Sequence, residues 1–155
     1  MDESNSLPVR GLLPPVVLLV AIVLMVVLHV LIPAAQLIAF PWRLSGAALV
    51  VAGLALNVWA DVLFKRAGTA VKPFEPSASL VLNGPFSFSR NPMYLGMVLL
   101  LAGIAVGLGS ATPWLVVPFF VWQVTQRFII VEERKLETTF GHRYLDYKGK
   151  VRRWF

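Results

Sequence analysis

The chain has 155 residues, of which 57% are apolar and 14% charged, and it contains no cysteine. This composition excludes a disulfide framework, a cysteine nucleophile and thiolate-bound metals, and it is typical of an integral membrane protein. The formal net charge of +6 is a signal for membrane insertion and headgroups more than for nucleic acid, because the basic residues gather beside apolar runs. A solvated basic tail is favoured over specific lipid binding.

Four hydrophobic runs follow one another along the chain. They cover about residues 12–32, 44–64, 93–109 and 113–131. A membrane-spanning helix needs about 20 mostly apolar residues, with about 17 at the short end, so the first two runs qualify easily and the last two as a tight pair. We therefore predict an all-α integral membrane protein, a single domain over residues 1–155 with about four transmembrane helices, in which the third and fourth form a hairpin.

The lysines and arginines predict the orientation of these helices. They concentrate in the loop between the second and third runs and in the tail after the fourth, two segments separated by an even number of crossings. Cytoplasmic segments carry the excess of Lys and Arg, so both termini are expected in the cytoplasm. Asp2 and Glu3 give the amino terminus no positive anchor of its own.

The loop from Lys65 to Arg90 contains several glycines and prolines that forbid a long helix and favour a turn-rich path. A loop of this length either covers a pocket or simply connects two helices. In the run that follows, Gly103 and Gly107 form a small-residue face that lets a neighbouring helix approach closely.

Two polar clusters stand at the same depth of the predicted hairpin. One is the run from Arg90 to Gly96, and the other contains Arg127 and Glu132-Glu133. Folding the hairpin brings Arg90 opposite Glu133, and Gly96 opposite Arg127. Charges cost several kcal/mol inside a bilayer, so such a cluster is a functional-site hypothesis. Its guanidiniums, carboxylates and phenol suit a zwitterionic ligand.

The last segment, residues 132–155, is predicted to be a cytosolic tail. Apolar and aromatic residues recur there at helical spacing, at Leu136, Phe140, Tyr144 and Tyr147. This pattern predicts an interfacial helix that Gly141 weakens or breaks. With only His29 and His142 in the chain, far apart, no metal centre is expected.

The two clusters resemble the signature of the isoprenylcysteine carboxyl methyltransferase family and its phospholipid methyltransferase relatives. That signature is an Arg-His-Pro-x-Tyr-x-Gly run at the start of a helix, followed some tens of residues later by Glu-Glu at the end of the next helix. The matching residues are Arg90, Pro92, Tyr94, Gly96, Glu132 and Glu133. The similarity covers roughly residues 73–155, includes features of bacterial members, and implies location in a bacterial inner membrane.

The resemblance implies a methyltransferase that uses S-adenosylmethionine at the membrane–cytosol interface. Its partners would be the lipid bilayer and a small lipophilic or lipid-linked acceptor carrying a carboxylate, thiol or amine, with no nucleic acid and no metal. The implied cofactor-binding residues are Arg90, Asn91, Tyr94, Gly96, Glu132 and Glu133. Asn91 stands where the family has His, and it keeps a donor and an acceptor but cannot titrate.

Each residue type suits one part of that cofactor. Arg90 can hold the carboxylate in a bidentate fork, and Glu132 or Glu133 can accept hydrogen bonds from the ammonium or the ribose hydroxyls. Tyr94 offers an aromatic face to the sulfonium, or its hydroxyl to the amino acid moiety. Gly96 admits either the cofactor or a neighbouring helix.

Arg127 is the candidate catalytic residue, as the group that holds an anionic acceptor. It could instead serve the cofactor or pair with Glu132.

Other classes of protein stay open at this point. A noncatalytic membrane scaffold would use the Arg/Glu cluster as a structural ion pair. A small transporter would usually need an acidic residue in its first helix for proton coupling, and residues 12–32 contain none. Related sterol reductases use a nicotinamide cofactor, but this chain is short for their added helices. Binding of S-adenosylmethionine would separate these cases.

Overall fold

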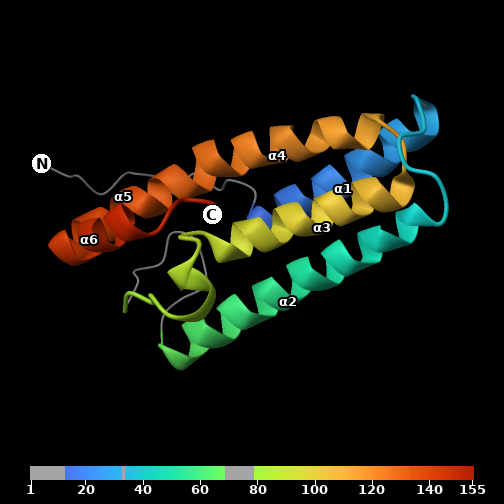
Figure 1. Cartoon of the computed structure of the whole chain (residues 1–155). Coiled ribbons are helices and arrows are strands. Elements are labelled where there is room, and N and C mark those ends of the chain that lie inside the picture. Colours follow the sequence, from blue (N-terminus) through green and yellow to red (C-terminus); the bar gives the residue numbers. More distant parts are fainter. Residues whose placement is uncertain (1–12, 33, 69–78) are drawn as a thin grey trace, which may run out of the picture.

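A computed structural model describes residues 13–32, 34–68 and 79–155. The described residues form helices and no strand, as predicted. The helices are α1 (Pro14–Leu31), α2 (Ser45–Arg66), α3 (Pro92–Leu108), α4 (Val116–Val124), α5 (Ile130–Phe140) and α6 (His142–Lys150). The first four lie side by side and alternate in direction, with α2 against α3 and with α1 against α3 and α4 (Figure 1). The acidic amino terminus and residues 69–78, the middle of the loop expected either to cover a pocket or to connect two helices, lie outside the described residues.

The described helices have the length and composition of membrane spans. Three of them qualify, Pro14–Leu31, Trp42–Arg66 and Thr112–Phe140, while Pro92–Leu108 is a shorter apolar helix at the lower limit of a crossing. Their outer surfaces expose large apolar side chains such as Leu19, Val51 and Phe119. Such surfaces fit a hydrocarbon environment, and the prediction of a membrane protein is supported. The number of crossings and the orientation stay predictions.

Proline and glycine set several helix ends. Pro14 and Pro92 stand in the first turns of α1 and α3, where the missing N–H has no intrahelical partner to lose. α3 ends at Gly109 and α5 at Gly141, whose φ angles are 75° and 51°. Glycine adopts positive φ without a Cβ clash, so the chain can leave the helix there.

The fourth predicted helix continues beyond residue 131. The chain is helical from Thr112 to Phe140, through a 3-10 turn, α4, a π-helical turn at Thr125–Ile129 and α5. Hydropathy falls after Val131, but a helix satisfies its own backbone groups in water as well as in lipid and continues until Gly141 interrupts it. α6 follows this break. Its location at the membrane surface stays a prediction.

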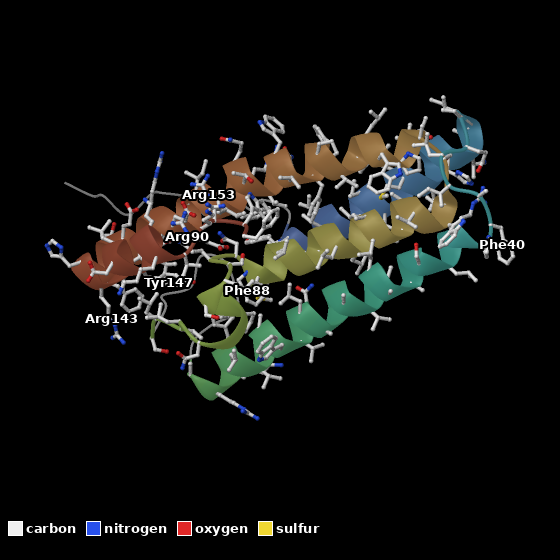
Figure 2. The ribbon with its side chains drawn as sticks, in the orientation of Figure 1. Phe40, Phe88, Arg90, Arg143, Tyr147 and Arg153 are labelled. Carbon is white, nitrogen blue, oxygen red and sulfur yellow. The ribbon has the colours of Figure 1, made fainter. Side chains whose placement is uncertain are left out.

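The two ends of the bundle differ in charge. Arg90, Arg143 and Arg153 gather at the end where α5 and α6 lie, and Phe40 marks the opposite end (Figure 2). At the Phe40 end, polar contacts hold the connection between α1 and α2. One of them is the hydrogen bond that Arg43 Nε donates to the Ile38 carbonyl at 2.8 Å. This asymmetry fits the pattern of Lys and Arg from which the orientation is predicted.

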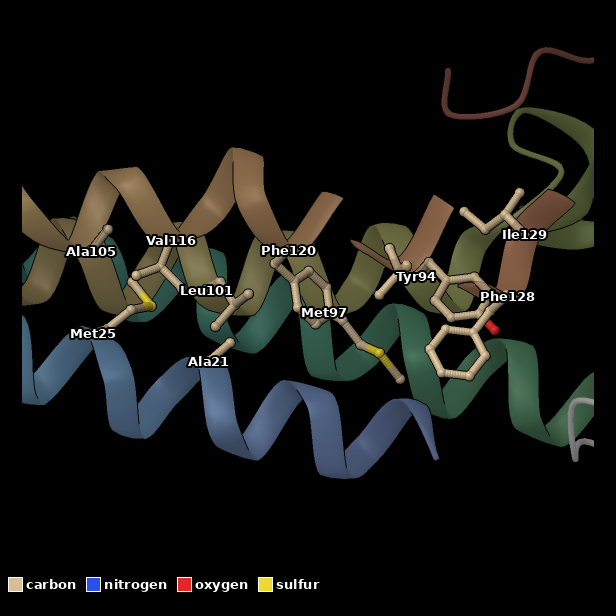
Figure 3. Close-up of a cluster of buried hydrophobic side chains, with 11 residues drawn as sticks. Ala21, Met25, Tyr94, Met97, Leu101, Ala105, Val116, Phe120, Phe128 and Ile129 are labelled. Atoms are coloured by element: carbon tan, nitrogen blue, oxygen red, sulfur yellow. The ribbon is translucent and has the colours of Figure 1, made fainter. Parts of the chain in front are cut away.

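The apolar core lies between α1, α3 and α4. Ala21 and Met25 of α1 meet Met97 and Leu101 of α3, and Phe120 of α4 fills the space between them (Figure 3). Among the described residues, this cluster contains none from α2, so α2 must be held by another kind of contact.

α2 and α3 pack through close backbone contact. A Cβ on Gly53 would lie 2.5 Å from the Gly96 carbonyl oxygen, and one on Gly103 would lie 2.6 Å from that of Gly46. These glycines repeat every seven residues on each helix, so they meet in two successive layers of an antiparallel pair. The predicted packing role of Gly103 is confirmed, whereas a Cβ on Gly107 would meet nothing within 4 Å.

We therefore predict that Gly103→Leu lowers the free energy of unfolding by about 1–3 kcal/mol or more, because the added side chain must push the α2 backbone away. Gly107→Leu is the matched control, on the same helix but with open space around it. Thermal unfolding of both variants in detergent measures the difference. Equal midpoints for the two variants would contradict the close packing of α2 on α3.

Candidate active site

Glu133 on α5 is the centre of a buried charge cluster. The residue is 5% exposed and accepts two hydrogen bonds from Arg153, at 3.0 Å from Nε and 2.7 Å from Nη2. Nη2 of Arg90 lies 3.5 Å from the Glu133 carboxylate. Figure 2 shows the two arginines side by side. The structure thus brings Arg90 and Glu133 together, as the predicted hairpin requires.

Arg90 is incompletely paired in this cluster. Its side chain is 9% exposed, and its Nε and Nη1 atoms are buried without a hydrogen-bond partner. Buried polar groups nearly always have partners, because an unmade hydrogen bond costs free energy. Two guanidiniums also share one carboxylate, which leaves a surplus positive charge. The cluster can therefore accept an anionic group at Arg90.

The segment 151–155 completes the site by returning to the start of α3. The backbone N–H of Arg90 donates to the Arg152 carbonyl at 3.0 Å, and Asn91 Nδ2 donates to the Arg153 carbonyl at 3.1 Å. Trp154 packs against the apolar core. Asn91 therefore holds the returning segment, and it makes no side-chain cap to α3.

Glu132 has surroundings different from those of its neighbour. Its Oε1 accepts a hydrogen bond of 2.7 Å from the Tyr94 hydroxyl on α3. The Tyr94 ring in turn stacks on Phe128, with ring centroids 6.3 Å apart and planes inclined by 18°. The Glu133 carboxylate thus pairs with the two arginines. The Glu132 carboxylate instead bonds to Tyr94, whose ring stacks on Phe128.

α6 adds two tyrosines to this end of the site. Tyr144 is buried among the charges, and the pKa of its hydroxyl is raised to about 12, mainly by burial and then by the Glu133 charge, while the charge of Arg90 and a hydrogen bond with Arg90 act to lower it. The phenol therefore stays protonated at neutral pH and can donate a hydrogen bond. The Tyr147 hydroxyl donates to the Phe86 carbonyl at 2.6 Å.

Sequence reasoning did not identify three of these residues as part of the site. The helical spacing predicts Tyr144 and Tyr147 on the apolar face of a tail helix, although two phenols three residues apart on a basic helix are a signal for buried polar contacts. Arg153 is one of several basic residues in the predicted tail, and nothing in the local pattern distinguishes it. Its pairing depends on the return of the chain to α3, which no local pattern indicates.

Two of the predicted site residues lie apart from the cluster. Gly96 faces α2, since a Cβ there would lie 2.7 Å from the Gly53 carbonyl oxygen, so its predicted position opposite Arg127 is wrong. The hairpin alignment matched depth but not the direction of each residue around its helix. Arg127 lies in the π-helical turn with an exposed side chain and, within the described residues, has no ion-pair or hydrogen-bond partner.

The shared pairing of Glu133 makes a testable prediction about stability. Glu133→Gln is expected to lower the free energy of unfolding by about 3–5 kcal/mol, because it leaves a buried arginine without its counter-charge. Arg153→Gln is expected to cost less, since Arg90 still pairs with Glu133 and the Arg153 side chain is 37% exposed. Unfolding in detergent, followed by circular dichroism, compares the two variants.

Glu137→Gln is the control for this comparison. It removes the partly exposed pair with Lys148, for which a change of at most about 1 kcal/mol is expected. An Arg153→Gln variant as unstable as Glu133→Gln would show that Arg90 does not share the carboxylate.

Comparison with known proteins supports the resemblance. Residues 42–143 match the phospholipid methyltransferase family. An uncharacterized protein of Haemophilus influenzae is 44% identical over 62 residues, which are 40% of this chain and 98% of that protein. The protein-S-isoprenylcysteine O-methyltransferase of Saccharomyces cerevisiae is 35% identical over 72 residues, 46% of this chain and 30% of the yeast enzyme. No solved structure matches significantly. This chain, an integral membrane protein, belongs to the phospholipid methyltransferase family.

Proposed function

We propose that this protein is an S-adenosylmethionine-dependent methyltransferase that acts at the cytosolic edge of the membrane on a small lipophilic or lipid-linked acceptor. The observation that carries the proposal is the incomplete pairing of Arg90, a buried guanidinium with two polar atoms that lack partners. A carboxylate is the natural partner for such a fork. The amino acid moiety of the cofactor carries one.

The remaining groups of the site fit the other parts of this cofactor. Glu132 has a second carboxylate oxygen, besides the one bonded to Tyr94, that can accept from an ammonium or from ribose hydroxyls. The stacked rings of Tyr94 and Phe128 offer an aromatic surface to a sulfonium. Asn91 lies beside Arg90, with its amide nitrogen bonded to the returning segment and its amide oxygen able to accept.

S-adenosylmethionine, when bound, supplies an electrophilic methyl group on a positively charged sulfur. The chain's own contribution is then to position both reactants and to exclude water, which can provide most of the acceleration without a covalent nucleophile. Arg90, Glu132 and the returning segment 151–155 would fix the polar part of the cofactor. Arg127, on the neighbouring turn of the same long helix, is proposed to hold the acceptor.

A noncatalytic scaffold is not favoured. The bidentate pair between Arg153 and Glu133 would be enough to hold the end of the chain, and a structural role gives no reason to bury a second guanidinium whose hydrogen bonds are incomplete. Membership of a methyltransferase family points the same way. The name of the yeast relative describes an isoprenylated substrate, which supports a lipophilic acceptor here.

Titration calorimetry of the detergent-purified protein with S-adenosylmethionine, and with its demethylated product, tests the proposal. We expect saturable binding of both ligands. Arg90→Lys should weaken that binding at least about tenfold, because an ammonium keeps the charge but loses the planar fork. Glu132→Gln should weaken it as well, since the amide offers a weaker acceptor than a carboxylate.

Arg143→Lys is the matched control, because Arg143 is exposed on α6 at the same end of the bundle. It should bind as the wild-type protein does. Each variant is first checked for an unchanged unfolding midpoint. A folded wild-type protein that shows no saturable binding of either ligand would overturn the proposed function.

A further inference from the structure

The Phe40 end of the bundle consists of residues 34–44, which connect α1 to α2, and residues 109–115, which connect α3 to α4. Over these two stretches the sequence has a single charge, on Arg43. Large apolar side chains nonetheless stand at the surface, and Figure 2 shows Phe40 at the outer edge of this end. Apolar side chains exposed together mark contact with a partner or a membrane. The exposed fractions are 60% for Leu37, 75% for Phe40, 73% for Trp42, 65% for Leu44 and 69% for Leu115.

Polar side chains at this end are turned inward. His29 Nδ1 and Ser110 Oγ form a hydrogen bond of 2.7 Å, and Ser110 is only 1% exposed. The Thr112 hydroxyl is also buried and donates to the Leu28 carbonyl of α1 at 3.3 Å. A surface with polar groups inside and large apolar groups outside is the reverse of one that faces water, where polar side chains stay solvated.

The charged residue of this end, Arg43, is also held against the protein. Its Nε donates to the Ile38 carbonyl at 2.8 Å, and its Nη2 donates to the Gln36 side chain. The backbone of the connection is bonded as well, since the amides of Leu37 and Ile38 both donate to the Gly109 carbonyl, at 2.8 and 3.0 Å. An irregular segment can lie at membrane depth only when its polar groups are satisfied within the protein. These contacts meet that requirement for the groups they join.

The length of α3 indicates how deep this end lies. Arg90 directly precedes α3 and belongs to the buried charge cluster, which holds the start of the helix at the charged end. From there the 17 residues of α3 extend about 25 Å at 1.5 Å per residue, whereas the hydrocarbon core of a bilayer is about 30 Å thick. With its charges at one interface, the bundle therefore reaches its Phe40 end before it reaches the opposite headgroups.

We propose that the Phe40 end is immersed in the lipid of one leaflet, with Phe40 and Trp42 against acyl chains and glycerol groups, and does not reach the water on that side. Phospholipid rather than a second protein covers this surface, because the exposed side chains continue the apolar outer surface of the helices, to which Val30 of α1 and Val51 of α2 belong. Tryptophan suits this depth, since its N–H can meet a lipid carbonyl while its rings stay in the apolar layer. The protein then meets water only at its charged end.

Spin labels measure this immersion directly, because the chain contains no cysteine of its own. A single nitroxide is attached to each of Phe40→Cys, Val51→Cys and Arg143→Cys in the purified full-length protein in phosphatidylcholine nanodiscs. Val51 is the control on the outer surface of α2, and Arg143 is the exposed control at the charged end. Power saturation compares the collision rates of each label with oxygen, which concentrates in lipid, and with a polar nickel chelate, which stays in water.

We expect the ratio of oxygen to chelate collisions at position 40 to approach that at position 51 and to exceed that at position 143 at least fivefold. Leu37→Cys, at a second exposed position of the same connection, should give the same result. Each labelled variant is first checked for an unchanged unfolding midpoint.

Two outcomes would overturn the proposal. A ratio at position 40 equal to that at position 143 would show that this end lies in water. Low collision rates with both reagents at positions 37 and 40 would show that protein, such as a second copy of the chain, covers it. Neither measurement involves the cofactor, so the result does not depend on the proposed function.

Discussion

The pairing of one buried carboxylate with two arginines organises the charged end of this protein. Glu133 lies on α5, Arg90 directly precedes α3, and Arg153 belongs to the segment that returns after α6. A buried carboxylate is tolerated only when it is well paired, so these three segments are constrained to meet. The contacts of Asn91 with the returning backbone and of Tyr147 with Phe86 then close the same end. Because the positive charge exceeds the negative, the closed end still favours an anion.

The rest of the bundle holds this cluster in position by a different kind of contact. Within a membrane the hydrophobic effect does not drive one apolar helix onto another, so close packing must do so. α2 and α3 achieve it with glycines that let the two backbones touch. α3 is fixed on its other side by the core it shares with α1 and α4. The start of α3, which Arg90 directly precedes, is therefore fixed by a helix that is held on both sides.

Much of the fold follows from simple patterns in the sequence. Hydropathy located all four apolar helices, and the hairpin correctly paired Arg90 with Glu133. Hydropathy could not give the end of the fourth predicted helix. A helix that leaves the lipid keeps its backbone hydrogen bonds, so it can continue past the end of the apolar run. Depth alone also misplaced Gly96, since it says nothing about the direction of a residue around its helix. Arg153 was missed because its contact depends on a turn of the whole chain after Gly141.

The position of Arg153 in the chain also constrains the order in which the charged end can form. Before the segment after α6 docks, Glu133 has only Arg90, the more distant arginine, as its partner. The start of α3 then also lacks the bonds from Arg90 and Asn91 to the carbonyls of residues 152 and 153. A bundle whose apolar helices are already packed can therefore still have an open charged end, and docking of this short segment is the step that closes it.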